Sequence, residues 1–254
     1  MNNLFSLQGR TALITGGSRG IGRMIAAGFL AQGARVYISA RKVAACDQTA
    51  AELSALGHCV SLPADVSSVA GAKALAAAYA AHEPQLDILV NNAGAAWGAP
   101  FDDFPESGWD KVVDLNLKAP FFLTQALAGH LRLAGKQRVA KVINIASIDG
   151  LSVNPQETYS YAGSKAGLVH LTRRMALRLI QDNIAVTAIA PGAFASEMNR
   201  DARDRAEEVS AHIPAGRIGV DEDMAGAAIY LASRAGDYVV GETLVVDGGV
   251  TLQR

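Results

Sequence analysis

Short apolar runs alternate with longer amphipathic runs along almost the whole chain. The apolar runs have the length of buried strands, and the longer runs have the spacing of helices. The predicted strands are residues 10–15, 35–40, 58–62, 86–90, 141–146, 184–189 and 243–247. The predicted helices are 23–31, 43–56, 69–81, most of 105–133, one that contains Tyr161 and one that ends at Ala232. Strands separated by helices of this length predict βαβ crossovers and a parallel sheet, and so an α/β fold.

Size and composition indicate one domain over residues 1–254. Half of the 254 residues are hydrophobic, which suffices for one large core, and no repeat beyond the βα alternation and no low-complexity linker occurs. Polar residues interrupt every apolar run before it could span a bilayer, and no basic-then-apolar signal opens the chain. We therefore expect a soluble, cytoplasmic protein without membrane contact.

The charged and metal-ligating residues exclude several classes of partner. A formal net charge of −1 gives no electrostatic support for binding nucleic acid or an anionic membrane. Cys46 and Cys59 are the only cysteines, which is no disulfide framework, and the five histidines are too scattered for a metal site. We expect a reduced, metal-free protein that acts on a small molecule.

A glycine-rich turn follows the first predicted strand. Gly16, Gly20 and Gly22 come directly after Thr15 and before the first predicted helix. Glycines let the backbone approach a pyrophosphate, and a helix N-terminus offers free N–H groups and a positive dipole. The turn therefore predicts a dinucleotide phosphate site, although a tight turn without a ligand has the same glycines.

Polar residues at the ends of the next strands indicate which dinucleotide binds. Arg41 ends the second strand, where an acidic residue would select NAD, and with Arg19 in the glycine turn it favours the 2′-phosphate of NADP(H). Each arginine alone reads equally well as a solvated charge. Asp65, after the third strand, could accept from the adenine amino group or cap the next helix, a role for which Ser67 competes. Asn91-Asn-Ala-Gly94 ends the fourth strand, where open α/β sheets bind ligands.

Tyr161 and Lys165 form the candidate catalytic pair. Four residues apart in a helix, they share one face, and the ammonium of Lys165 is expected to lower the pKa of the Tyr161 phenol toward the working range. A packed tyrosine with a solvated lysine is the alternative. Ser147 ends the fifth strand and could donate to a substrate carbonyl or be a surface hydroxyl; no G-x-S-x-G nucleophile elbow surrounds it.

Two further segments carry structural expectations. Residues 197–208 are highly charged with few core-forming residues, so we expect a mobile lid over about 193–218, or else an ordinary solvated helix. Pro120 has no N–H to bond the carbonyl of Asn116, so we expect a kink there that leaves this oxygen available. A simple helix break at Pro120, without a catalytic effect, is the equal alternative. Asp221 is the expected N-cap of the helix that ends at Ala232.

Taken together, the motifs resemble the short-chain dehydrogenase/reductase family. Thr15-Gly-x-x-x-Gly-x-Gly22, Asn91-Asn-Ala-Gly94, Asn116, Ser147, Tyr161-x-x-x-Lys165 and Pro191-Gly192 occur in the order and approximate spacing of that family and cover nearly the whole chain. The resemblance implies a doubly wound Rossmann fold with a seven-stranded parallel sheet flanked by helices, assembled as a homotetramer. Within the family the chain is similar to NADPH-dependent β-ketoacyl reductases, rhamnolipid-pathway members included.

The resemblance also implies roles for individual residues. Tyr161 would be the general acid in reduction, Ser147 would bind the carbonyl oxygen, Lys165 would bind the nicotinamide ribose and lower the tyrosine pKa, and Asn116 would hold a relay water. The implied NADP(H)-binding residues are Gly16, Ser18, Arg19, Gly20, Ile21, Gly22, Arg41, Asp65, Val66, Asn92, Ala93, Gly94, Tyr161, Lys165, Pro191, Gly192, Phe194 and Ser196. The implied substrate pocket is Trp97, Ile148, Phe194 and Met198.

The expected activity is NADPH-dependent reduction of a ketone to a secondary alcohol. A 3-oxoacyl thioester is the favoured substrate, with acyl carrier protein or coenzyme A as its carrier. A sugar, polyol or hydroxysteroid dehydrogenase is one alternative. An inactive NADP-sensing protein is another. The presence of both Ser147 and Tyr161 argues against the sensor, which would need neither hydroxyl. The chain departs from the family at Ser196, where threonine is usual, at Val220, where proline is common, and in a Ser147–Tyr161 spacing one residue longer than usual, which is expected to reshape the pocket.

Overall fold

One sheet of seven parallel strands organises the molecule, in the order β3-β2-β1-β4-β5-β6-β7. The computed structural model describes residues 3–253, apart from the side chain of Arg200. The strands are β1 Thr11–Thr15, β2 Arg35–Ser39, β3 Cys59–Ser61, β4 Ile88–Asn91, β5 Ala140–Ile145, β6 Ile184–Pro191 and β7 Thr243–Val246. Each lies within two residues of a predicted strand, and the doubly wound fold with seven strands is confirmed.

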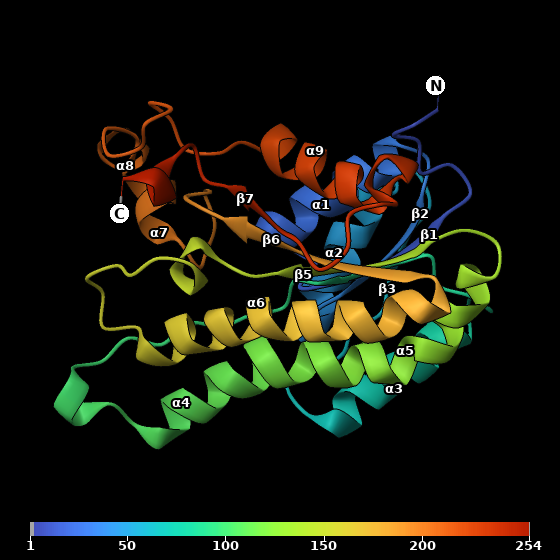
Figure 1. The fold of residues 1–254 in the computed structure, drawn as a ribbon, viewed down its shortest axis with the longest axis horizontal. Helices are drawn as coiled ribbons and strands as arrows, with labels where there is room; N and C mark the ends of the chain where they lie inside the picture. The colour runs from blue at the N-terminus through green and yellow to red at the C-terminus, as the bar shows by residue number, and fades with distance from the viewer. Residues whose placement is uncertain (1–2, 254) are drawn as a thin grey trace.

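Helices cover both faces of this sheet (Figure 1). They are α1 Gly20–Ala31, α2 Val43–Leu53, α3 Val69–Ala80, α4 Glu106–Val113, α5 Ala119–Gly135, α6 Tyr159–Leu179, α7 Arg200–Asp204, α8 Ala206–Ser210 and α9 Asp221–Ala232. Helices α1, α2 and α9 pack on one face and α3, α5 and α6 on the other. None of the helices among residues 3–253 has the length and apolar character to cross a membrane.

Successive strand residues face opposite layers, which is why the strands read as unbroken apolar runs. In β1, Ala12 and Ile14 join the cluster under α1 and α9, whereas Leu13 joins the cluster under α3, α5 and α6. All three side chains are fully buried. A sheet covered on both faces needs apolar side chains at every position, so periodicity alone could not have separated its faces.

A π-helical turn over Asp114–Lys118 joins α4 to α5 in one continuous helical run. The N–H of Ala119 bonds to the carbonyl of Asp114, five residues back instead of four. Pro120 follows in the first turn of α5. The predicted helix over most of 105–133 is confirmed, and the interruption expected at Pro120 takes the form of this widened turn.

The caps of α3 and α9 differ from the candidates that the sequence suggested. Helix α3 is capped by Ser68, whose hydroxyl accepts from the N–H of Gly71, and not by Ser67 or Asp65. Helix α9 starts after Val220, and Asp221 is its first residue rather than its cap. The carboxylate of Asp223 accepts from the N–H of Val220 at 2.9 Å. Serine and aspartate runs at these boundaries offer several possible caps, and only the backbone geometry selects one.

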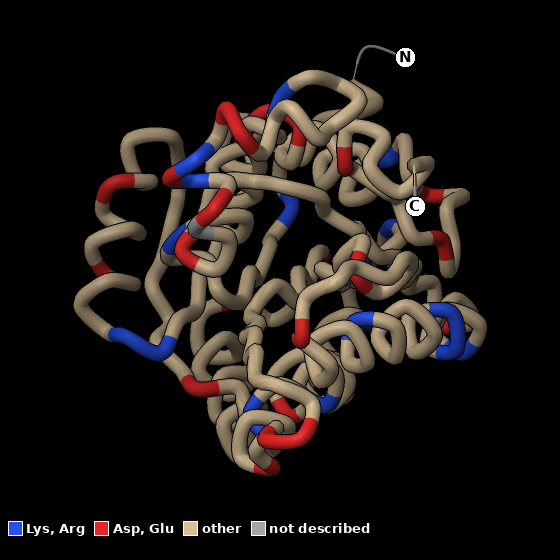
Figure 2. Tube along the Cα trace, turned by 90° about the vertical axis from the view of Figure 1, so that its left-hand side faces the viewer, with Lys and Arg blue, Asp and Glu red and all other residues tan. Residues whose placement is uncertain are grey.

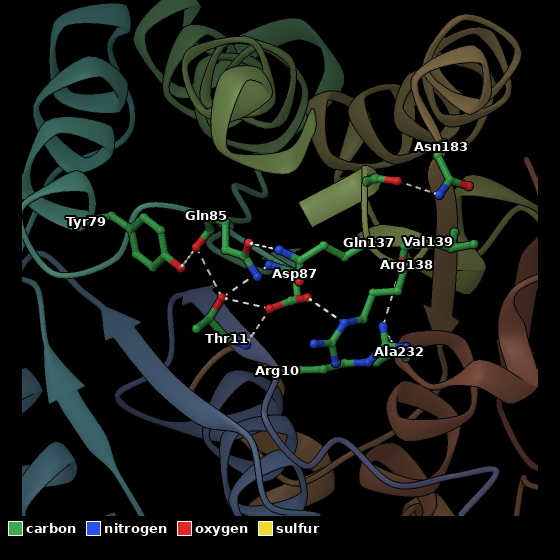
Figure 3. Close-up of polar contacts among 11 residues, drawn as sticks. Arg10, Thr11, Tyr79, Gln85, Asp87, Gln137, Arg138, Val139, Asn183 and Ala232 are labelled. Carbon is green, nitrogen blue, oxygen red and sulfur yellow. Dashed lines mark hydrogen bonds and ion pairs between the residues drawn. The ribbon is translucent and has the colours of Figure 1, made fainter. Parts of the chain in front are cut away.

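The two ends of the parallel strands, called here the amino edge and the carboxyl edge of the sheet, differ in the contacts that hold them. The carboxyl ends of the strands lie toward the left of Figure 1, beside α7 and α8, and Figure 2 looks onto this end. At the amino ends, a buried polar network joins separate elements (Figure 3). Asp87 accepts from the N–H of Thr11 at 2.9 Å and pairs with Arg138 at 3.5 Å, while Arg10 donates to the carbonyl of Ala232 at 3.1 Å. The amino ends of the strands are therefore cross-linked by polar contacts, which we call the clamp, and the loops at the carboxyl ends are available to form a site.

Candidate active site

The glycine turn lies against the end of β4. Gly16 has φ of +66°, and a Cβ on Gly22 would lie 2.4 Å from the Gly16 carbonyl and 2.5 Å from Asn92 Nδ2, so neither position has room for a larger residue without strain. Asn92 Nδ2 donates to the carbonyls of Thr15 and Gly16 at 2.9 and 3.2 Å. The turn is thus held in shape by β4 before any ligand arrives.

The N-terminus of α1 fits a phosphate group. Arg19 occupies the N-cap position without a side-chain cap hydrogen bond, and no acidic residue lies in the first turn. The first N–H groups of this 12-residue helix are therefore neither capped nor neutralised by side chains. Ser196 lies beside the same turn, because a Cβ on Gly20 would come within 3.2 Å of its Cβ.

Arg41 and Asp65 lie close together where β2 and β3 end. The N–H of Ala64 bonds to the carbonyl of Ala40 at 3.1 Å, which aligns the two strand ends. Burial raises the pKa of Asp65. The N–H of Ser67 and the charge of Arg41 together lower it by more than burial raises it, so the net shift is downward. Arg41 and Arg19 are both exposed, and Val66 is buried in the core cluster below Asp65.

Two hydroxyls at this end of the sheet escaped the sequence analysis as site residues. Thr15 Oγ1 accepts from the N–H groups of Asn92 and Ala93, both at 3.0 Å, and so fixes the backbone after β4. Ser39 Oγ, at the end of β2, is buried without a hydrogen-bond partner. The available signal was a hydroxyl directly before the glycine turn for Thr15, and one two residues before Arg41 for Ser39.

Asn116 is a fully buried side chain with all its polar atoms in use. Its Nδ2 donates to the carbonyl of Ala95 at 2.9 Å and to Ser164 Oγ at 3.1 Å, and its Oδ1 accepts from the N–H of Ala95 at 2.8 Å. Ser164, which sequence reasoning missed, in turn donates to the carbonyl of Tyr161. Asn116 therefore links the loop after β4 to the first turn of α6.

Ser147, Tyr161 and Lys165 meet at the end of β5. Ser147 Oγ accepts from the N–H of Asp149 at 3.1 Å, and hydrogen bonding to Ser147 lowers the pKa of Tyr161. Lys165 Nζ donates to the carbonyl of Ile145 at 2.6 Å and lies 5.7 Å from the centre of the Tyr161 ring. The pairing of these three residues at one point agrees with the sequence prediction.

Burial, however, shifts the two pKa values in a way the sequence analysis did not expect. It raises the pKa of Tyr161 to about 12, an effect larger than that of Ser147, and Asp149 adds to the rise. Burial also lowers the pKa of Lys165 to about 8. The net shift of the Tyr161 pKa is therefore upward and not downward as expected, because removing the phenolate from water costs more than hydrogen bonding to Ser147 returns.

The expected substrate-pocket residues have unequal access to the site. Ile148 is buried directly after Ser147, and Met198 is half exposed beyond β6. The Trp97 ring lies against Gly108, with Lys111 Nζ 5.0 Å from its centre. Phe194 is buried in the core against Gly219, so its ring is core packing and only its backbone can face the cleft.

The segment after β6 carries several surface ion pairs of its own. Arg203 pairs with Glu197 and Asp204, and Arg205 pairs with Asp201 and Glu208. Such exposed pairs contribute little stability. Pro191 ends β6, and the N–H of Gly192 bonds to the carbonyl of Val246 at 2.9 Å, which anchors the segment where it leaves the sheet.

Comparisons with known proteins agree with this geometry. The profile of a family described as Enoyl-(Acyl carrier protein) reductase matches residues 16–251. The chain is 48% identical to the rhamnolipids biosynthesis 3-oxoacyl-[acyl-carrier-protein] reductase of Pseudomonas aeruginosa, over 99% of this chain and 100% of that one. It is 38% identical to the 2-dehydro-3-deoxy-D-gluconate 5-dehydrogenase of Dickeya dadantii, over 97% of each.

Solved structures give the same two groups of relatives. The Pseudomonas aeruginosa RhlG/NADP active-site complex superposes with a TM-score of 0.95 at 48% identity, over 99% of this chain and 100% of that one. The gluconate 5-dehydrogenase of Burkholderia cenocepacia in complex with NADP and tartrate superposes with a TM-score of 0.90 at 35% identity, over 98% of each.

Proposed function

This chain belongs to the short-chain dehydrogenase/reductase family, and we propose that it uses NADPH to reduce the ketone of a 3-oxoacyl thioester, or of a similar carbonyl compound, to a secondary alcohol. The observation that carries the proposal is the meeting of Ser147, Tyr161 and Lys165 at the end of β5. A carbonyl oxygen placed there has two hydroxyl donors within reach.

The residues at the carboxyl edge fit NADP(H), which supplies the hydride when bound. The uncapped N-terminus of α1 would hold the pyrophosphate, and Arg19 and Arg41 would hold the 2′-phosphate. Asp65 would accept from the adenine amino group. The remaining implied contacts, from Asn92 to Gly94 and from Pro191 to Ser196, border the same cleft.

The chain's own residues supply the acid for reduction. Tyr161 would donate its hydroxyl proton to the carbonyl oxygen while Ser147 donates a hydrogen bond to it, so both stabilise the negative charge that develops there. The raised pKa of Tyr161, about 12, keeps this hydroxyl protonated at neutral pH. A protonated donor is what the reduction direction requires.

Lys165 and Asn116 would act beside that pair. Lys165 is aimed by the Ile145 carbonyl, and its Nζ lies near Gly94, where an added Cβ would be 3.8 Å away. From there it would bind the nicotinamide ribose and carry the positive charge that assists Tyr161. The side chain of Asn116 is already hydrogen-bonded to Ala95 and Ser164. Its main-chain carbonyl is therefore the group that would hold the relay water.

The substrate class is inferred from the relatives and the pocket. The relative of 48% identity is named a 3-oxoacyl-[acyl-carrier-protein] reductase, and Ile148 and Met198 offer apolar contacts to an acyl chain. Carriage on acyl carrier protein or coenzyme A is part of this proposal. A sugar-acid dehydrogenase is the second candidate, favoured by the relatives of 36–38% identity.

The assembly and the lid are also proposals. A groove of about 450 Å³ between α5 and α6 is lined by Leu117, Phe121, Phe122, Leu171 and their neighbours, and an exposed apolar groove on paired helices suits a homotetramer. The weak ion pairs of residues 193–218 suit a mobile substrate lid. The free thiols Cys46 and Cys59 suit a cytoplasmic enzyme.

A substrate panel with a catalytic variant tests the function. Acetoacetyl and longer 3-oxoacyl thioesters, sugar acids and steroids are compared with NADPH, and the thioesters should give the highest kcat/KM. Tyr161→Phe removes one oxygen and should lower kcat on the best substrate by about 10²-fold or more, with NADPH binding retained. Near-wild-type kcat in this variant, or turnover of sugar acids alone, would contradict the proposal.

A further inference from the structure

Glu157 joins the two loops that flank the catalytic helix. Its Oε1 accepts from the N–H of Phe101 at 3.3 Å and from the hydroxyl of Tyr159 at 3.2 Å. Its carbonyl accepts from the N–H of Ala99 at 3.2 Å. The loop after β4 is thus bound to the loop that leads into α6, two residues before Tyr159 and four before Tyr161.

The joined loops expose an apolar surface beside the site. Phe101 is 73% exposed and Val153 is 91% exposed, and Leu151 and Tyr159 are also among the exposed large hydrophobic residues. The rings of Phe101 and Tyr159 pack edge to face with centres 5.6 Å apart. We call these four residues the acyl ledge. Phe101 and Tyr159 are in contact, and Leu151 and Val153 are exposed on the loop that Glu157 joins to them. Exposed apolar side chains on joined loops can bind an apolar ligand.

Acidic residues outnumber basic ones around the acyl ledge, although Lys111 lies over the Trp97 ring and Lys165 lies beside Tyr161. Segments 94–110 and 147–160 contain Asp102, Asp103, Glu106, Asp110, Asp149 and Glu157 and no lysine or arginine, although the chain has nearly equal numbers of both signs, 24 acidic and 23 basic residues. Burial, Glu157 and Asp102 all raise the pKa of Tyr159, and Asp149 acts in the same direction on Tyr161. Acidic side chains therefore act on both the ledge and the catalytic tyrosine.

Arg203 and Arg205 of the proposed lid, residues 193–218, do little to offset the negative charge of these carboxylates. Arg203 and Arg205 are each paired with two carboxylates of their own segment. A substrate that carries a carboxylate would approach through negative potential without one of these arginines free to receive it. An uncharged apolar chain meets no such barrier and gains contact with Phe101 and Val153.

We propose that the acyl ledge binds the part of the substrate beyond the reacting ketone, and that Phe101, Val153 and Glu157 determine specificity for an uncharged apolar chain over a sugar acid. The inference rests on the proposed reduction of 3-oxoacyl compounds at the same site. Full burial of a methylene is worth about fourfold in binding, so a chain lying against an open ledge should gain about twofold per methylene.

A chain-length series tests the apolar part. The substrates are the uncharged methyl esters of 3-oxobutanoate, 3-oxohexanoate, 3-oxooctanoate and 3-oxodecanoate, assayed with NADPH. In the wild type kcat/KM should rise by about twofold per methylene. Phe101→Ser should flatten this rise, with a loss of about tenfold on the longest ester and little change on the shortest, and Val153→Ser should do so more weakly.

Controls separate the ledge from a general effect of lost apolar surface. Val153 is almost fully exposed, so Val153→Ser serves if Phe101→Ser should fold poorly. Leu56→Ser changes a residue that is 53% exposed in the turn between α2 and β3, and it should keep the wild-type slope. The loss should lie mainly in KM for long esters, because the reacting atoms are untouched.

A charge variant tests the electrostatic part. Glu157→Gln keeps an oxygen acceptor for the N–H of Phe101 and removes the charge. At low ionic strength it should raise kcat/KM for 5-keto-gluconate by about twofold and leave methyl 3-oxobutanoate unchanged, and added salt should reduce the difference. Equal effects on both substrates would overturn the charge argument.

The outcomes distinguish this inference from the proposed function. If the wild type reduces the esters but Phe101→Ser and Val153→Ser keep the same slope, the acyl ledge is refuted and the proposed function stands. If the wild type reduces 5-keto-gluconate and none of the 3-oxo esters or thioesters, the proposed function falls and the ledge falls with it.

Discussion

At the scale of single residues, the pKa values of Tyr161 and Lys165 depend on burial more than on charged neighbours. Tyr161 and Lys165 have the four-residue spacing that the sequence shows, and that spacing was enough to predict their meeting. The direction of the pKa shifts was not predictable from it, because the shifts depend on how completely the fold removes both groups from water. Thr15 and Ser164 were missed for a related reason: Thr15 accepts from the backbone of Asn92 and Ser164 accepts from Asn116, partners that only the fold brings near.

The buried ammonium of Lys165 should cost stability in a pH-dependent way. Its pKa is lowered to about 8 in the folded chain from an unfolded value of about 10.4. The cost is therefore fully present below pH 8 and disappears as the pH rises toward about 10.4, because the folded lysine loses its proton first. Lys165→Met should raise the melting temperature at pH 7 by several degrees, while activity is lost.

Thermal melts of both proteins at pH 7 and pH 10 check this expectation. The advantage of Lys165→Met should shrink at the higher pH, since the wild type then no longer buries a charge. A difference that is the same at both values would show that the ammonium is not what the fold disfavours. Lys42→Met, which changes an exposed lysine, provides the control.

Arg41 should set the preference for the phosphorylated dinucleotide. A guanidinium–phosphate pair is a strong contact, so Arg41→Asp should weaken NADPH binding by about 1.5–3 kcal/mol and leave NADH binding almost unchanged. Titration of both dinucleotides measures the ratio of the two dissociation constants. Lys42→Asp changes the neighbouring exposed cation and should alter the ratio far less; an unchanged ratio in Arg41→Asp would remove this arginine from recognition.

Helices and strands were the part of the molecule that the sequence predicted best. Strand positions followed from apolar runs, since a parallel sheet buried on both faces leaves no other place for them. Exact ends and caps did not follow, as Ser68 and Val220 show. The π turn over Asp114–Lys118 was also beyond sequence reasoning, because Pro120 predicts an interruption but not which hydrogen bonds replace the missing one.

The π turn should be tied to the relay through Pro120. Pro120→Ala restores an N–H four residues after Asn116, which lets the turn revert to an α-helical ladder and engages the Asn116 carbonyl. The variant should gain up to about 3 kcal/mol of stability and lose turnover. Melting temperature, kcat and its pH profile measure both effects. Pro84→Ala, in the exposed turn before β4, is the matched control, and wild-type kcat with an unaltered profile would exclude Pro120 from the relay.

The whole molecule places every candidate catalytic group at one edge of the sheet and its strongest buried polar network at the other. The parallel sheet and the place of the site at the carboxyl ends of its strands could be predicted from the alternation of strands and helices. The clamp around Asp87 could not, because its partners come from three distant parts of the chain. For the proposed assembly, the described residues offer an apolar groove between α5 and α6.

That groove should hold copies of the chain together. Phe121 projects from α5 into it and is partly exposed. Phe121→Glu would place a charge in a contact that excludes water, so the proposed tetramer should dissociate to smaller species. Sedimentation at matched concentrations measures this. Val43→Glu, an exposed apolar residue on α2, should keep the wild-type mass, and a wild type that sediments as a monomer would refute the assembly.

The clamp at the amino edge also bears on how such an enzyme can change its substrate over generations. Asp87, Thr11 and Arg10 hold the strands without help from the loops at the opposite end. Substitutions in those loops therefore draw little on the folding stability that keeps the chain above its threshold for function. A lineage can then try new residues at positions such as Phe101 or Val153 one at a time, with each intermediate still folded. The RhlG/NADP complex and the gluconate 5-dehydrogenase of Burkholderia cenocepacia share this frame, with TM-scores of 0.95 and 0.90 at 48% and 35% identity.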